Sequence, residues 1–212
     1  EGPLRLGVIA TICPYLAPYL LPAAAAALPK APLVLVEDLT GALIADLLEG
    51  KLDAAIVATA PERERIETID LYDEPFWLIV GAQEAQPAAP VAGADIEADR
   101  LLLLSDGHCL RDQALDLCGT TPPAGRLGDL RAASLETILH LVAAGYGVTL
   151  APQLAVDSWK GRPGVRALPM AAGAARRARL VFRRDTARKP AMKALAQAIR
   201  DNLPPGLGAR QS

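Results

Sequence analysis

The sequence predicts an α/β protein with two β-α-β lobes, and three observations support this. Short apolar strands alternate with helices in the first third of the chain, an order typical of a parallel sheet covered by helices. The alternation stops near residue 75 and resumes after a Pro- and Ala-rich stretch over 81–94. A last strand and helix, after about Arg177, have no place in the second block. We therefore expect them to return and complete the first sheet, so that the chain crosses twice between the lobes.

The first lobe is expected to contain residues 1–75 together with 178–203. Pro14 is suited to the first turn of a helix, but Pro18 and Pro22 should kink that helix. Thr40 is a candidate N-cap for the next helix, which Gly50 would end. The expected elements are strands over 4–10, 33–37, 54–58 and 66–72, and helices from 14 and over 40–49.

The second lobe is expected to span residues 76–177, before the chain returns to the first lobe and ends in a flexible tail over 204–212. Asp73-Glu74-Pro75 should interrupt the extended chain and so separate two strands. Ser134 and Gly145 fit the two ends of a capped helix. The remaining expected elements are strands over 76–80, 101–104, 126–131, 148–151, 165–168 and 180–183, and helices over 109–118, 134–144 and 190–202.

Composition excludes several classes of protein. Of the 212 residues, 51% are hydrophobic and 22% charged, which is ordinary for a globular chain and excludes wholesale disorder. The net charge of −2 argues against nucleic-acid binding by this segment alone. No apolar run approaches the ~20 residues of a membrane span, and no secretory signal is recognisable. The three cysteines are too few for a disulfide-stapled fold, so we expect a reducing, cytoplasmic setting.

The segment from Ser105 to Cys118 carries the most chemical information. Cys109 stands at the expected start of a helix, where the helix dipole and free N–H groups favour a thiolate. His108 is adjacent, and Asp112 lies one turn on, within reach of a hydrogen-bonded relay. These neighbours are typical of a reactive cysteine. No zinc spacing, phosphate-binding loop or serine-nucleophile motif is present, so we expect neither a metal nor a cofactor.

Cys118 follows Cys109 by nine residues. On a regular helix, nine residues separate the two Cα atoms by about 13.5 Å along the axis. A disulfide needs Cα atoms within about 7 Å, so the two thiols can bond only if the helix unwinds. Gly119, Pro122 and Pro123 would make its end easy to loosen. Two unrelated buried cysteines remain the alternative interpretation.

The run His108-Cys109-Leu110-Arg111-Asp112-Gln113-Ala114, followed by Cys118, resembles the redox segment of the OxyR family. This family consists of peroxide-sensing transcription regulators of the LysR type. The resemblance extends from about Leu4 to Leu203, and the redox segment is its most specific part. Further matches are Leu6-Gly7-Val8-Ile9 with Thr11, the prolines at 14, 18 and 22, Gly50-Lys51-Leu52-Asp53, Asp73-Glu74-Pro75, Arg131 with Ser134-Leu135-Glu136-Thr137, Val142-Ala143-Ala144-Gly145 and Arg176-Arg177.

The resemblance implies a LysR-type effector domain, with two periplasmic-binding-protein-like lobes joined by a double-crossover hinge. It implies that Cys109 is the peroxidatic thiol and Cys118 the resolving thiol, which form a reversible disulfide through a Cys109 sulfenic acid. His108 and Asp112 would assist this chemistry. The residues that would surround the peroxide are Thr11, Thr40, Gly107, His108 and Arg177.

The resemblance also implies partners. This domain would form a homodimer, and the full-length protein a tetramer that recruits RNA polymerase. DNA contact would come only through the family's N-terminal helix-turn-helix domain, which is absent from this sequence. The chemistry would be stoichiometric, so an enzyme is not expected.

Three other functions remain open at this point. They are a LysR-type domain that binds a small metabolite, a thiol peroxidase with turnover, and a transport-type binding protein. Cys13 departs from the family pattern and lies two residues after Thr11. It is either a rival thiol or a small apolar filler.

Overall fold

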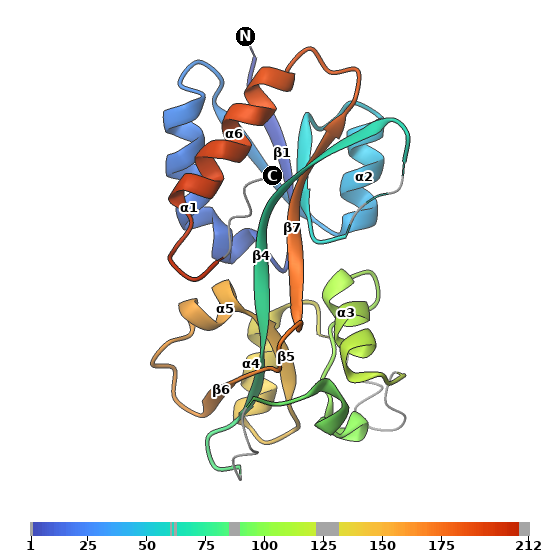
Figure 1. The fold of residues 1–212 in the computed structure, drawn as a ribbon, viewed down its shortest axis with the longest axis vertical. Helices are drawn as coiled ribbons and strands as arrows, with labels where there is room; N and C mark the ends of the chain where they lie inside the picture. The colour runs from blue at the N-terminus through green and yellow to red at the C-terminus, as the bar shows by residue number, and fades with distance from the viewer. Residues whose placement is uncertain (1, 60, 62, 85–89, 122–131, 208–212) are drawn as a thin grey trace. The chain divides into compact units, whose positions relative to one another are not determined.

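The computed structural model describes residues 2–59, 61, 63–84, 90–121 and 132–207. The chain divides into two units: unit 1 contains residues 1–74 and 177–212, and unit 2 contains residues 75–176. Both boundaries fall inside long strands, β4 (Ile66–Gly81) and β7 (Ala175–Arg183) (Figure 1). Each of these two strands therefore contributes residues to both units.

Unit 1 is built on the strand order β2-β1-β3-β7, with β4 next to β7. β1 (Leu4–Ile9) pairs in parallel with β2 (Leu33–Asp38) and β3 (Ala54–Val57), as the β-α-β pattern predicts. β7 pairs antiparallel with β3. The expected return of the last strand to the first sheet is therefore confirmed, and β7 is longer than the predicted 180–183.

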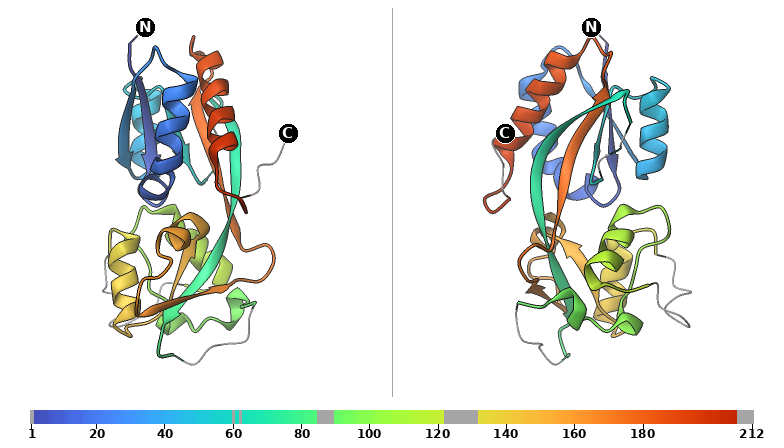
Figure 2. Two further views of the ribbon diagram at one scale, coloured as in Figure 1. Left: turned by 90° about the vertical axis from the view of Figure 1, so that its left-hand side faces the viewer. Right: turned by 45° about the vertical axis from the view of Figure 1, so that its right-hand side comes forward.

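Helices cover both faces of this sheet. α1 (Cys13–Ala27) and α6 (Lys189–Asn202) lie side by side on one face, and α2 (Thr40–Leu48) covers the opposite face (Figure 2). α1 is one continuous helix that contains Pro18 and Pro22, so the two prolines do not end it, and the predicted kink stays a prediction. The helix continues because of the spacing of its prolines: Pro14, Pro18 and Pro22 follow one another at four-residue intervals and are all exposed. The carbonyls that lose a helical N–H donor therefore face water, which can replace it.

Unit 2 is built around the second half of β4. This strand pairs antiparallel with β5 (Thr149–Pro152) and β6 (Val165–Pro169). The helices are α3 (Cys109–Cys118), α4 (Leu135–Ala143) and α5 (Gln153–Ser158), with two 3₁₀ turns, η1 (Gly93–Asp95) and η2 (Ala98–Arg100). α3 has the predicted bounds, and Ser134 caps α4 by accepting a hydrogen bond from the Thr137 amide at 3.2 Å. α5 was not anticipated from the sequence.

The structure does not confirm two of the predicted strands of unit 2. The segment 101–104 forms isolated parallel bridges, Leu101 with Val148 and Leu104 with Ala132, instead of a continuous strand. The strand predicted over 126–131 lies outside the described residues. In the predicted tail, Leu207 is buried, and residues 208–212 lie outside the described part of the chain.

β4 corrects the prediction of two strands separated by Asp73-Glu74-Pro75. It runs without interruption from Ile66 to Gly81. The pairing with β5 begins at Phe76, so Pro75 comes just before that ladder starts. Because proline lacks only the N–H donor, it is tolerated where no ladder bond depends on it.

α3 packs against the apolar core of unit 2 through Ala114 and Cys118. Its core neighbours come from β4, β6, β5 with the residue before it, and the segments that flank η1 and η2: Leu78, Val80, Val91, Ile96, Leu101, Leu103, Val148, Leu150 and Leu168. We call this set, with Ala114 and Cys118, the α3 cluster. Within the described part of the chain, every helix is too short or too polar to span a lipid bilayer.

Candidate functional site

The chain turns sharply into the N-terminus of α3. Gly107 has a φ of 91°, a left-handed conformation that favours glycine. His108 is the N-cap residue, and Cys109 is the first residue of the helix. The sequence order Gly-His-Cys thus delivers the thiol to the end of the helix where the N–H groups are not used by helical hydrogen bonds.

Both reactive candidates at this turn are buried. His108 is 7% exposed and Cys109 8% exposed. Burial lowers the pKa of His108, so its imidazole is neutral at neutral pH. A neutral imidazole has one donor and one acceptor nitrogen, and it can therefore exchange hydrogen bonds with a small polar molecule or a thiol.

Arg111 fastens the first turn of α3 to the preceding loop. Its Nη1 donates to the carbonyl of Leu104 at 3.1 Å, and its Nε pairs with Asp106 Oδ1 at 3.0 Å. The Arg111 side chain is 20% exposed, whereas that of Asp106 is 74% exposed. The bond to the Leu104 carbonyl is therefore the less solvated of the two.

Asp112 is exposed in the first turn of α3. A carboxylate there interacts favourably with the positive end of the helix dipole. Its predicted part in a relay with Cys109 stays a prediction.

Cys118 closes the other end of α3. It is 7% exposed within the α3 cluster, and burial raises the pKa of its thiol. Gly119, in a left-handed conformation with φ 60°, caps the helix. No disulfide joins Cys13, Cys109 or Cys118. Since α3 is intact over its ten residues, its two cysteines are about 13.5 Å apart along the axis, as predicted for a helix that must unwind before they can bond.

Two further predicted residues lie at one edge of the sheet in unit 1. Ile9 and Asp38 are register partners in parallel strands, and Thr11 and Thr40 each follow two residues later. Thr11 is 4% exposed. Thr40 is the first residue of α2, with Leu39 at the N-cap position expected for Thr40 itself.

The hydroxyl of Thr40 has an unusual environment. Its Oγ1 is buried and has no hydrogen-bond partner among the described residues. Thr40 also lines a hollow of about 630 Å³, together with Thr59 and Arg63. Unit 1 thus presents a hydroxyl that a small polar ligand could satisfy.

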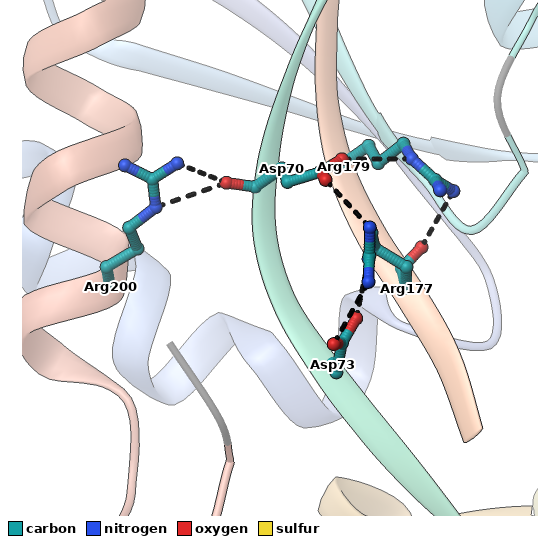
Figure 3. Close-up of polar contacts among 5 residues, drawn as sticks. All are labelled: Asp70, Asp73, Arg177, Arg179 and Arg200. Atoms are coloured by element: carbon teal, nitrogen blue, oxygen red, sulfur yellow. Dashed lines mark hydrogen bonds and ion pairs between the residues drawn. The ribbon is translucent and has the colours of Figure 1, made fainter. Parts of the chain in front are cut away.

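Arg177 is held by carboxylates of unit 1 (Figure 3). Its Nε and Nη2 donate to the two oxygens of Asp73 at 2.6 and 3.1 Å, and its Nη1 donates to Asp70 Oδ2 at 3.0 Å. Arg179 adds a bond from Nε to Asp70 Oδ1 at 3.0 Å, and Arg200 of α6 donates to the Asp70 carbonyl. We call these five residues the Asp70 network. The two carboxylates raise the pKa of Arg177, chiefly through the hydrogen bond to Asp73.

Cys13 is the first residue of α1 and is 5% exposed. Burial, a hydrogen bond to Glu37 and the negative charge of Glu37 raise its pKa to about 12. These effects outweigh the helix N-terminus, which would favour a thiolate. At neutral pH Cys13 is therefore a protonated, weakly nucleophilic thiol, in agreement with the filler interpretation.

The predicted site residues therefore fall into two groups. Gly107, His108, Cys109 and Asp112 meet at the N-terminus of α3 in unit 2, and Cys118 closes the same helix. Thr11, Thr40 and Arg177 belong to unit 1. Sequence reasoning did not single out Arg111, although it belongs to the redox segment.

Comparison with known proteins identifies relatives of the whole chain. The family model for the LysR substrate binding domain matches residues 1–204. The chain is 42% identical over 209 residues to the DNA-binding transcriptional dual regulator OxyR of Escherichia coli K12, covering 96% of this chain and 67% of that protein. It is 41% identical over 203 residues to a probable hydrogen peroxide-inducible genes activator of Mycobacterium avium, covering 92% and 64%.

Solved structures give the same result. The reduced form of the OxyR regulatory domain from Pseudomonas aeruginosa superposes with a TM-score of 0.83 at 36% identity, covering 94% of this chain and 97% of that one. The reduced form of OxyR from N. meningitidis has a TM-score of 0.83 at 32% identity, covering 98% of both chains. The predicted fold class is thereby confirmed.

Proposed function

The chain belongs to the LysR substrate-binding domain family, among its OxyR members, and from this premise we propose that it is the hydrogen-peroxide-sensing regulatory domain of a LysR-type transcription regulator. One observation carries the proposal most directly. The two buried cysteines of the redox segment stand at opposite ends of one helix, the first of them beside a neutral histidine.

The proposed chemistry uses hydrogen peroxide as the oxidant. The Cys109 thiolate attacks one peroxide oxygen, the O–O bond breaks, and the released hydroxide takes up a proton to leave as water. Cys109 is then a sulfenic acid. The Cys118 thiolate attacks its sulfur, the S–S bond forms, the S–O bond breaks, and a second water leaves.

The supporting residues have roles that suit their chemistry. Neutral His108 can accept a proton from the Cys109 thiol or donate a hydrogen bond to peroxide. Thr11 and Thr40 supply hydroxyls for a small polar ligand, and the unsatisfied Thr40 hydroxyl favours such a role. Gly107 allows the turn that presents Cys109. Arg177 would contribute positive charge, although Asp70 and Asp73 offset it.

The regulatory output follows from the same helix. Because the disulfide cannot form in an intact α3, oxidation exchanges helix packing for a covalent bond and so gives two discrete states. The chemistry is stoichiometric, with one event per cycle, in a cytoplasmic regulator. Homodimerisation of this domain, a tetramer of the full-length protein, DNA contact through a separate domain and contact with RNA polymerase complete the proposal.

The test begins with reduced protein and one equivalent of hydrogen peroxide. Free thiols are then blocked, and the digested peptides are mapped by mass. We expect a Cys109–Cys118 link within seconds and an unmodified Cys13. Cys109→Ser should abolish the reaction, and Cys118→Ser should leave a longer-lived sulfenic acid. Cys13→Ser is the matched control and should behave as the wild type.

Two outcomes would contradict the proposal. Oxidation spread equally over the three cysteines would mean that the redox segment is inert and that a metabolite-binding domain is the better assignment. Rapid consumption of many equivalents of peroxide with a thiol reductant would instead identify a thiol peroxidase.

A further inference from the structure

The proposed function requires Cys118 to leave a packed core, in which a backbone contact between Gly93 and the end of α3 holds it. We propose, in an inference that rests on that function, that Gly93 is a positioning residue for the resolving cysteine. Its missing side chain lets the last turn of α3 dock directly on η1, which keeps Cys118 in the α3 cluster until Cys109 has been oxidised.

The contact is between two stretches of backbone. A Cβ at position 93 would lie 1.9 Å from the carbonyl oxygen of Leu117, 2.7 Å from its carbonyl carbon and 3.3 Å from the amide nitrogen of Cys118. Backbone atoms cannot rotate away as the end of a flexible side chain can. Any side chain at position 93 must therefore push the Leu117–Cys118 peptide away from η1.

The glycine is required for space and not for its backbone conformation. The φ angle of Gly93 is not positive, whereas Gly107 and Gly119, at the two ends of α3, both have a positive φ. Alanine could therefore adopt the backbone of residue 93 without strain. The effect of a substitution there comes from the contact with α3 alone.

The segment that leads into η1 is tied to the end of β6, so the end of α3 is the part that should yield. Val91 forms a parallel bridge with Met170: its amide donates to the Pro169 carbonyl at 3.0 Å, and its carbonyl accepts from the Ala171 amide at 2.8 Å. Val91 and Ile96 are buried in the α3 cluster. The end of α3 is held more locally, by bonds from Gly119 N to the Asp116 carbonyl at 3.2 Å and from Thr120 N to the Leu115 carbonyl at 3.1 Å.

This docking acts on the second chemical step. Burial raises the pKa of Cys118, so the docked thiol is protonated and a poor nucleophile. Release of the last turn exposes the thiol, lets it ionise and lets it approach Cys109. Its thiolate then attacks the sulfenic sulfur, with loss of water. Formation of the sulfenic acid at Cys109, at the other end of the helix, does not need this release.

The experiment separates the two steps in Gly93→Ala. A sulfenic-acid-specific trap measures oxidation of Cys109 by peroxide, and quenched mass mapping measures closure of the disulfide. We expect closure to be about tenfold faster, because the overpacked end of α3 is released more often, and sulfenic acid formation to be unchanged. Alkylation of Cys118 in the reduced protein should accelerate by a similar factor.

Gly7→Ala, in β1 of unit 1, is the control. A Cβ at position 7 would lie 2.7 Å from Leu43 Cδ2 and 2.8 Å from Leu52 Cδ1, so this variant also overpacks a buried backbone position but touches neither α3 nor the α3 cluster. It should lower stability without accelerating closure. Equal acceleration in both glycine variants, or wild-type closure in Gly93→Ala, would overturn the proposal.

A second variant guards against misfolding of Gly93→Ala. Val91→Ala removes two methyl groups from the α3 cluster, which contains Cys118, without a clash. It should also accelerate closure and alkylation of Cys118, and unchanged rates contradict the proposal. If the wild type forms no disulfide at all, the proposed function fails. Alkylation of Cys118 then still decides whether Gly93 positions this thiol.

Discussion

The three thiols are all buried, yet their surroundings differ in chemistry. Cys109 and Cys13 both begin a helix. The Cys13 thiol, however, is buried and hydrogen-bonded to the carboxylate of Glu37, and its pKa is raised to about 12. Cys118 ends a helix inside an apolar cluster. Burial alone therefore does not mark a cysteine as reactive or inert. At Cys13 it is burial together with the hydrogen bond and negative charge of Glu37 that keeps the thiol protonated.

The raised pKa of Cys13 predicts a specific dependence of stability on pH. In the folded chain its pKa is about 12, against an ordinary value of 9.0, so the folded state keeps the proton longer. This stabilisation is fully present below pH 9 and is lost as pH rises through 12. The difference in unfolding free energy between wild type and Cys13→Ala should fall above pH 9, by at most about 1.4 kcal/mol per pH unit. Urea unfolding from pH 7 to 10.5 measures it, and a constant difference would contradict the assignment.

His108 predicts a dependence at the acidic end. Burial lowers its pKa below the ordinary 6.5, so the unfolded chain binds the proton more readily than the folded one. The contribution of neutral His108 to the free energy of unfolding is present above pH 6.5 and is lost as the pH falls through the pKa of the folded state. Urea unfolding between pH 7.5 and 5 should show a steeper loss in wild type than in His108→Asn. His140→Asn, which changes an exposed histidine on α4, should keep the wild-type slope.

At the scale of elements, α3 is an ordinary capped helix with two different attachments. The N-terminal turn is tied by Arg111 to the loop before it, and the C-terminal turn rests on Gly93 and the α3 cluster. Unwinding this helix therefore requires loss of polar contacts at one end and of apolar contacts at the other.

Arg111→Ala tests the polar attachment. The variant removes the donor to the Leu104 carbonyl and the ion pair with Asp106, and we expect a loss of about 1–2 kcal/mol in unfolding free energy. Disulfide closure should also be faster, because the first turn of α3 is released. Asp106→Asn keeps the bond to Leu104 and removes only a well-exposed charge, so its cost should be a few tenths of a kcal/mol. Equal losses in the two variants, measured by urea unfolding, would show that the carbonyl contact is unimportant.

The elements also show which features a sequence can predict. The bounds of α3 and the cap at Ser134 depend on residues within one turn of each other, and both predictions are confirmed. The continuity of β4 through Pro75 depends on where its pairing with β5 begins, which local sequence does not encode. The contact of Gly93 with Leu117 joins residues far apart in the chain. Such contacts decide how the site is held, and they appear only in the folded structure.

At the scale of the whole molecule, β4 and β7 are the strands shared by both units. The Asp70 network lies within unit 1, on the stretches of these strands that adjoin the boundary, and Arg200 adds α6 to it (Figure 3). β7 and α6, whose arginines lie 107 to 130 residues after Asp70, thus converge on one aspartate of β4. A network in which several charges share partners is a better stability argument than an isolated surface pair.

Asp70→Asn tests whether this convergence stabilises unit 1. The substitution weakens the bonds from Arg177 and Arg179 but keeps the backbone carbonyl that Arg200 contacts. We expect the midpoint of thermal unfolding to fall by about 2 °C at low salt, because these partly exposed pairs are individually weak but act together. Glu67→Gln, on the same strand, breaks a single pair with Lys189 and should have a smaller effect.

Since salt screens exposed charges, the difference between the two variants should shrink at 1 M salt. A difference that persists at 1 M salt would mean that Asp70 acts through packing or hydrogen-bond geometry and not through its charge.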